Sequence, residues 1–354
     1  ADWVRVVLGA TITKGASLFA LGRWHEAQVI LRGAIELAER HELAHEQLRA
    51  RNNLAGPGWQ DRPDEALRMA AESFELARRY GETIWMYQFA GLSTAAAFER
   101  GDWERWLAID AELMTRSDVP PFYATWFVSV SSQVAAFQGR EHEAESGLRE
   151  SRRLAGQVAS AMLLAAQHHG RALHTLAAGR WSEAVGEGLE AAANSNFAVA
   201  GRAIAGRAAV AGGLMEQAEE MASAWRAAAA DAHGAYAEAL QGWLRAGVLA
   251  LRGDVAAARL EYLAAKKQLS DLGQRFDLAQ LNLEFGTLLG AAVPEARQAA
   301  EEADAVLAEL GCSHYAQIYR TRSVGPVAGN RPARASRTVQ EAAAGKAMAV
   351  DTDT

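Results

Sequence analysis

The sequence predicts an all-α protein, a solenoid of about eight stacked helical hairpins with a period of about 39 residues. Three observations predict it: a turn phrase that recurs along the chain, a helix-favouring composition, and small residues at helical spacing. Half of the 354 residues are hydrophobic and only seven are proline, which favours helix throughout. A fixed period of this size indicates units that bury their apolar faces against their neighbours.

The recurring phrase is Gly-x-x-x-Glu-Ala. It begins at Gly22, Gly139 and Gly179, with variants at Asp61 and Gly101 and weaker echoes further on. Aligned on its last residue, the phrase defines eight anchors, which lie 34 to 40 residues apart. The anchors are Ala27, Ala66, Trp106, Ala144, Ala184, Ala218, Ala258 and Ala296.

Each unit is interpreted as two amphipathic helices joined by this phrase. In the fourth unit, residues 123–137 are apolar with small residues interleaved, and residues 141–153 begin with acidic side chains. Gly139 between them predicts a helix stop, because glycine accepts a positive φ. The acidic residues suit the positive end of the second helix dipole.

Small residues recur seven positions after the anchors, where a step of seven keeps to one face of a helix. Six of the eight residues there are small, which indicates close packing between helices. The eight are Ala34, Ser73, Leu113, Ser151, Ala191, Trp225, Ala265 and Ala303.

Charge and cysteine content narrow the class of protein. The net charge of −7 argues against a large nucleic-acid surface. The single cysteine, Cys312, cannot form an internal disulfide; we interpret it as buried or inert, and it fits a reducing, cytoplasmic location. No run approaches the roughly 20 apolar residues of a membrane span.

The chain is predicted to hold two regions. Residues 1–320 carry the repeats, and residues 321–354 combine Gly, Pro and Arg without apolar periodicity, which predicts a disordered basic tail. The chain begins at Ala1 rather than at Met. We therefore expect a segment of a longer protein, with processing as the alternative.

The Gly-x-x-x-Glu-Ala phrase and the small residue seven positions later resemble tetratricopeptide (TPR) repeats over residues 2–319. The resemblance implies a right-handed superhelix with a concave binding surface. Two departures concern its fine geometry: the period is near 39 rather than 34, and the proline that usually closes a TPR unit is missing.

Residues 51–55, 63–67, 75–81 and 101–103 resemble a narrower group. They look like the C-terminal repeats of bacterial class III adenylate/guanylate cyclases with an ATPase module, and of large ATP-binding LuxR-type regulators. The resemblance implies a non-catalytic regulatory array in a signalling protein, whose partner is a protein, a peptide or a second copy. A stand-alone scaffold or adaptor is the alternative.

The TPR register also selects residues for the concave surface, with an unused solvent face as the alternative interpretation. Positions 15 and 11 before an anchor would line a groove, and positions 18 before would lie at its edge. The candidates for binding a partner are Arg51, Gln88, Trp126, Ser129, Gln133, His169 and Arg207.

One motif suggests catalysis, since residues 41–45 match the H-E-x-x-H pattern of zinc hydrolases. That chemistry needs His41 and His45 on one face of one helix, with Glu42 as general base. The repeat register instead places these residues across the turn between two units. Phosphate-binding loops and nucleophile elbows are missing as well. We therefore predict no catalytic residue, metal or cofactor, and keep a helical-repeat zinc hydrolase as the less favoured alternative.

Overall fold

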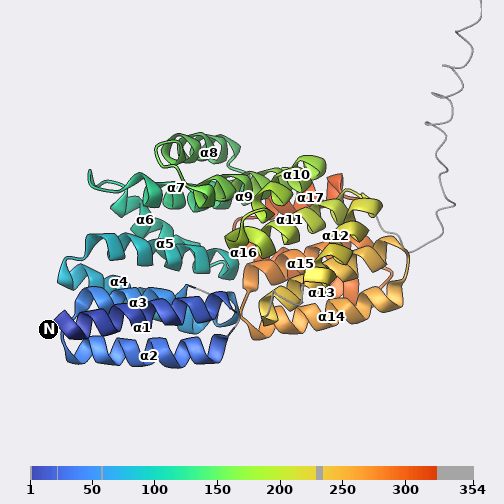
Figure 1. Ribbon diagram of the computed structural model, residues 1–354. Helices are drawn as coiled ribbons and strands as arrows, with labels where there is room; N and C mark the ends of the chain where they lie inside the picture. The colour runs from blue at the N-terminus through green and yellow to red at the C-terminus, as the bar shows by residue number, and fades with distance from the viewer. Residues whose placement is uncertain (1, 22, 57–58, 229–233, 325–354) are drawn as a thin grey trace, which may run out of the picture.

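The computed structural model describes residues 2–21, 23–56, 59–228 and 234–324. Within these ranges the chain forms seventeen α-helices and two short 3-10 helices, η1 (Trp59–Asp61) and η2 (Ser195–Phe197), and no strand (Figure 1). The predicted all-α class is confirmed. None of the described helices is both long and apolar enough to cross a membrane.

The odd-numbered helices form an inner row, in which each helix contacts the next odd-numbered one. Their inward faces are rich in buried alanine and aromatic residues. The row consists of α1 (Asp2–Ala20), α3 (Ala44–Ala55), α5 (Thr83–Arg100), α7 (Pro121–Phe137), α9 (Ala161–Ala177), α11 (Ala198–Ala211), α13 (Ala235–Leu251), α15 (Arg275–Leu289) and α17 (Ser313–Arg322).

The even-numbered helices form an outer layer, and each packs against the helices before and after it in the chain. Every one of them begins inside a copy of the turn phrase. They are α2 (Trp24–Arg40), α4 (Pro63–Tyr80), α6 (Trp103–Leu113), α8 (Glu141–Ala155), α10 (Trp181–Ala192), α12 (Met215–Ala228), α14 (Val255–Asp271) and α16 (Pro294–Glu309).

The eight anchors occupy one equivalent place in this arrangement. Each is the third or fourth residue of an even-numbered helix, and all eight are buried. The residues seven positions later are also buried, including the larger Leu113 and Trp225. The predicted packing face is therefore confirmed in every unit, because two turns of each outer helix lie against the inner row.

The turn glycines serve both the local bend and a long-range contact. Gly139 has a φ of 75° and Gly179 a φ of 66°, a region that favours glycine. A Cβ built on Gly139 would lie 2.7 Å from the His314 ring, and one on Gly179 would lie 3.0 Å from Ile318. The last helix, α17, thus crosses the turns of successive units, and only a residue without a side chain fits beneath it.

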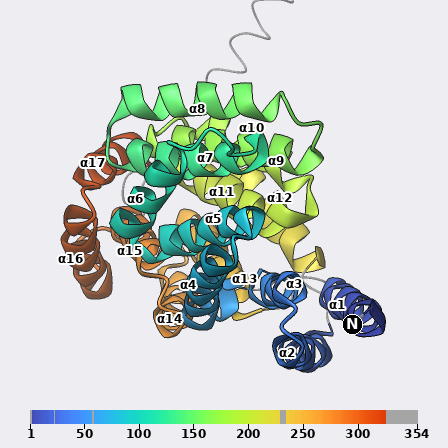
Figure 2. The ribbon, with the colours of Figure 1, turned by 90° about the vertical axis from the view of Figure 1, so that its left-hand side faces the viewer.

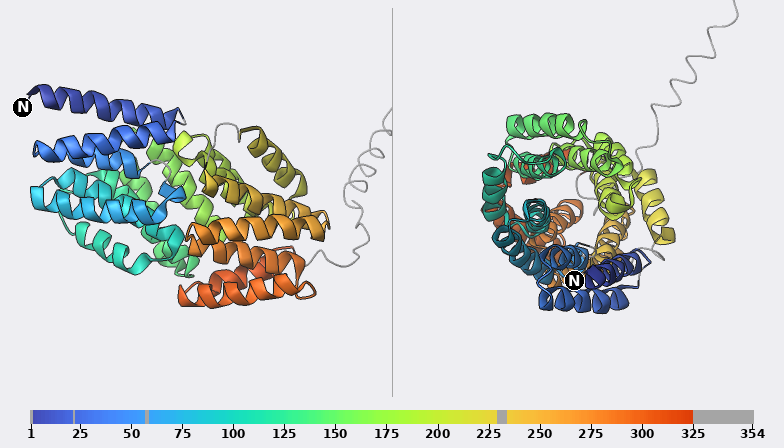
Figure 3. Two further views of the ribbon diagram at one scale, coloured as in Figure 1. Left: turned by 90° about the horizontal axis from the view of Figure 1, so that it is seen from below. Right: turned by 60° about the vertical axis from the view of Figure 1, so that its left-hand side comes forward.

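Two helices of the inner row that are far apart in the chain pack against each other. They are α15 and α5, and α5 lies more than 170 residues before α15. Figures 2 and 3 show the chain winding round a central region in which the cyan α5 and the orange α15 lie side by side. The Phe276 ring is fully buried there, with its centroid 5.5 Å from Phe98, 5.1 Å from Trp103 and 5.0 Å from Phe137. These edge-to-face contacts join the third and fourth hairpins to the last.

The boundary predicted between residues 320 and 321 falls inside α17. The helix continues to Arg322, and the Val324 backbone N–H donates to the Ala211 carbonyl at 2.9 Å. The tail predicted beyond this point lies, from residue 325 onward, outside the described residues. The final described residues are therefore tied to α11 rather than separate from the repeats.

We expect Gly139→Ala to destabilise the fold more than Gly253→Ala. Both glycines have a positive φ, so each substitution costs about 1–2 kcal/mol of backbone strain. Gly253 has open space around it, whereas a methyl group at Gly139 would collide with His314. The clash adds about 1–3 kcal/mol. Denaturant unfolding of the two variants checks this, and equal losses would show that α17 does not press on the turn.

Candidate functional site

The inner row encloses a pocket of about 370 Å³ between α5, α7, α9 and the start of α11. One part of its wall is aromatic. Trp126 from α7 stacks on Phe197 from η2 with ring centroids 5.9 Å apart and an interplanar angle of 13°. The His169 ring from α9 lies 5.2 Å from the same Phe197. The other aromatic residues of the wall are Phe98, Phe122 and Tyr123.

The rest of the wall combines apolar residues, among them Leu92, Val130 and Met162, with polar groups that are mostly uncharged. Gln133 lines the pocket and its Nε2 donates to the buried Ser129 Oγ, one turn away on α7, at 3.1 Å. Burial lowers the pKa of His169 to about 4, so its imidazole is neutral near pH 7. The remaining polar residues of the wall are Gln60, Gln88, Glu99 and Asn196.

Glu99 is the one acidic residue of the wall. Its Oε1 accepts a long hydrogen bond of 3.5 Å from Gln60 Nε2, and its Oε2 is buried without a partner among the described residues. Burial, and then the nearby Asp277 carboxylate, raise the pKa of Glu99 well above its usual value. The carboxyl group therefore tends to hold its proton while the pocket is empty.

Four of the seven residues selected by the repeat register meet in this pocket: Gln88, Trp126, Gln133 and His169. Ser129 lies behind them as the hydrogen-bond partner of Gln133. The register works here because positions one or two helical turns apart on α5, α7 and α9 all face the enclosed side. Their role in binding a partner stays a prediction.

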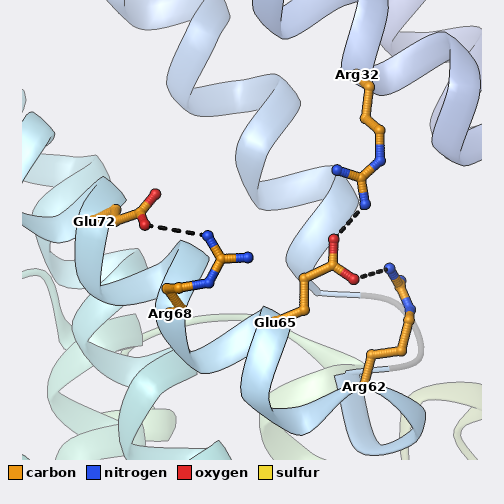
Figure 4. A network of polar contacts seen from close by, with 5 residues as sticks. All are labelled: Arg32, Arg62, Glu65, Arg68 and Glu72. Atoms are coloured by element: carbon orange, nitrogen blue, oxygen red, sulfur yellow. Dashed lines mark hydrogen bonds and ion pairs between the residues drawn. The ribbon is translucent and has the colours of Figure 1, made fainter.

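Arg51 lies away from the pocket. Its guanidinium pairs with Glu72 of α4 at 3.5 Å, and Glu72 also accepts from Arg68 at 3.4 Å, as Figure 4 shows. The same picture shows Glu65 between Arg62 and Arg32, the latter reaching across from α2. Arg51 thus belongs to a set of ion pairs that joins the first hairpins.

Arg207 is also elsewhere, buried between α11, α13 and α15. Its Nε donates to Glu284 Oε1 at 2.8 Å, and its NH2 group donates to Gln280 Oε1 at 2.7 Å. The guanidinium lies 4.1 Å from the Trp243 ring centroid, and Trp243 Nε1 donates to the other Glu284 oxygen at 2.6 Å. The side chain is therefore buried and paired within the protein, at a place that the register assigns to the groove.

The H-E-x-x-H residues do not share a helix. α2 ends at Arg40, Glu42 has a φ of 54°, and α3 begins at Ala44. His45 Nδ1 accepts from Trp85 Nε1 at 3.1 Å, while the exposed His41 lies on the other side of the break. The predicted turn is confirmed, and no group of three potential metal ligands occurs among the described residues.

Two further histidines contact acidic side chains, and the cysteine is buried. His168 Nδ1 lies 2.8 Å from Glu187, and His174 lies 3.4 Å from Glu141, so the two histidines contact different acidic residues. Cys312 is buried, as expected, and burial raises the pKa of its thiol to about 12.

A more open hollow of about 500 Å³ lies between Trp24 and the Asp61–Arg62 turn. Its wall includes Gly234, which adjoins residues 229–233 outside the described ranges. We take the pocket beside Trp126 as the candidate site, because four of the residues that the repeat register selects meet there.

Sequence reasoning missed Glu99, Tyr123 and Phe197. A signal existed for Glu99, since it is an acidic residue directly after the apolar run Ala95–Phe98 on a helix otherwise almost free of charge. Tyr123 and Phe197 both lie 21 positions before their anchors, a register position that the TPR comparison did not select. Trp85 and Leu163 lie at the same register position in their units and do not line the pocket, so this position alone does not identify the residues of the wall.

In comparison with known proteins, the chain matches no family model and no curated protein. The resemblance to TPR proteins therefore depends on the quoted motifs alone, and the pocket is interpreted from its own chemistry.

We expect Arg207→Met to cost about 3–5 kcal/mol of folding free energy, because it leaves the buried Glu284 carboxylate without its cation. Arg207→Met/Glu284→Gln removes both charges while keeping an acceptor for Trp243. The double variant should recover much of the loss. Chemical denaturation of the three proteins measures this, and a double variant no better than the single one would contradict the ion-pair interpretation.

Proposed function

We propose that this chain is a non-catalytic regulatory and protein-interaction array. In this proposal it is a right-handed TPR-like solenoid of about eight hairpins, of the kind that the cyclase–ATPase proteins and LuxR-type regulators named above carry. The equivalent burial of all eight anchors supports the repeat interpretation. The inner row of contacting odd-numbered helices supports a concave side.

The observation that carries the proposal is the convergence of Gln88, Trp126, Gln133 and His169 on one pocket. These residues come from three different units, and one register selected them. Aromatic surface with a few polar groups is typical of sites that bind another molecule. We propose that a protein or peptide inserts a side chain here, and that occupancy is passed on through α5, α7 and α9.

The space between α11 and α15 in the inner row is filled by side chains, which supports a single binding site rather than a long groove. Arg207, Gln280 and Glu284 fill the space between α11 and α15 with hydrogen bonds. Extended peptides therefore have no free path along the whole row. The proposed contact is a local insertion beside Trp126, with the partner surface resting on the rim of the pocket.

We expect Trp126→Ala/Gln133→Ala to lose a partner that the unmodified protein retains. Removing a buried aromatic contact costs about 2 kcal/mol or more, or roughly thirtyfold in affinity. Affinity capture from the native host, followed by binding measurements with the purified partner, checks this. Folding of the variant is verified by circular dichroism.

Leu260→Ala is the matched control, since Leu260 is 71% exposed on the outer helix α14. The expected partner is recovered with wild type and with Leu260→Ala but not with the pocket variant. Equal recovery of every partner by all three proteins would remove the assignment of this pocket.

A further inference from the structure

Among the described residues, none that lines the pocket beside Trp126 carries a positive charge near pH 7. Its titratable residues are Glu99, His169 and Tyr123, and no Lys or Arg is among the lining residues. The His169 imidazole is neutral near pH 7 because burial disfavours its charged form. An anionic ligand would thus meet a carboxyl group and no counter-charge.

Beyond Glu99, the neighbourhood also holds more acid than base. Asp277 of α15 lies close enough to act on Glu99, and its Oδ2 accepts from the Tyr236 hydroxyl of α13 at 2.7 Å. Arg207, a buried cation that acts on Asp277, already binds Glu284 and Gln280. Three buried acids, Glu99, Asp277 and Glu284, therefore lie near one buried base, Arg207, which is paired with Glu284.

We propose that the pocket binds an organic cation, a primary ammonium or guanidinium group on an apolar stem, with Glu99 as its counter-ion. The inference deepens the proposed function, on which it rests, by naming the chemistry of the group that enters. That group is either the amine of a small molecule or a Lys or Arg side chain of a partner. Both sources present the same charge and the same N–H donors.

Three features of the wall fit such a group. The Glu99 carboxyl group lines the pocket, and its long hydrogen bond to Gln60 leaves it acceptor capacity for an N–H donor. The aromatic residues Trp126, Tyr123 and Phe122 can stabilise a cation by cation–π attraction. The side-chain amides offer further acceptors, which favours a cation that carries N–H groups over a quaternary one. The volume is near the lower end of the usual range for ligand sites, which suits a small amine or one side chain.

Binding would change the protonation of Glu99. In the empty pocket, burial and the Asp277 carboxylate raise the pKa of Glu99, so the neutral acid predominates over a wider pH range. A bound cation favours the carboxylate and lowers that pKa. The proton then leaves to solvent, and up to one proton is released for each cation bound.

Isothermal titration calorimetry tests the proposal with three probes: phenethylamine, its neutral counterpart 2-phenylethanol, and N-acetyl-lysine methylamide. We expect wild type to bind at least one amine probe ten times or more tighter than 2-phenylethanol. Titrations in phosphate and Tris buffers at pH 7 should also show proton release. Glu99→Gln should abolish both the preference and the proton release, while Glu143→Gln, on the exposed face of α8, should change neither.

The lysine derivative and phenethylamine distinguish the two sources of the cation, according to which binds more tightly. Equal binding of phenethylamine and 2-phenylethanol would overturn the proposal, as would an unchanged amine preference in Glu99→Gln or no binding of either amine at millimolar concentration. If 2-phenylethanol binds as tightly as phenethylamine and Trp126→Ala abolishes the binding of both, the pocket remains a binding site and only its preference for cations fails.

Discussion

The burial of Phe276 is the contact on which the rest of the arrangement depends. Its ring lies against Phe98, Trp103 and Phe137, so the last hairpin is fixed to the third and fourth. Burying an aromatic ring of this size contributes about 1.5–3 kcal/mol from its surface alone, and its edge-to-face contacts add to that. Phe276 adds to the other contacts that α15 and α17 make with distant helices, such as Arg207 with Glu284 and Trp181 Nε1 with the Arg322 carbonyl.

The closure has a direct consequence for the pocket. Phe98 and Glu99 are consecutive residues at the C-terminal end of α5; Phe98 contacts Phe276, and both line the cavity. The contact with α15 therefore fixes the position of this part of the wall and brings Asp277 near Glu99. A ligand at Glu99 would thus bind where units far apart in the chain meet. Through this contact, binding in the pocket can change how α5 packs against α15.

The sequence predicts the repeated features well because each unit makes the same local contacts. The anchors, the thin face seven residues later, the positive φ of Gly139 and the break at Glu42 all follow from register. Arg207 shows the limit: its position suits a groove, yet it donates to Glu284 of α15, 77 residues away, in a contact that the period does not predict. A period reports what every unit shares, so a contact made once, such as that of Phe276, leaves no repeated signal. Glu99 escaped notice for the same reason.

Hydrogen exchange of Phe276→Leu, compared with wild type, tests the closure most directly. In an array held together only by nearest neighbours, a change in α15 affects the adjoining helices alone. The closed arrangement predicts that amides at the ends of α5 and α7 exchange about fivefold faster or more, together with those of α15, since they share one opening reaction. Faster exchange confined to α13–α17, with α5 and α7 unchanged, would contradict it.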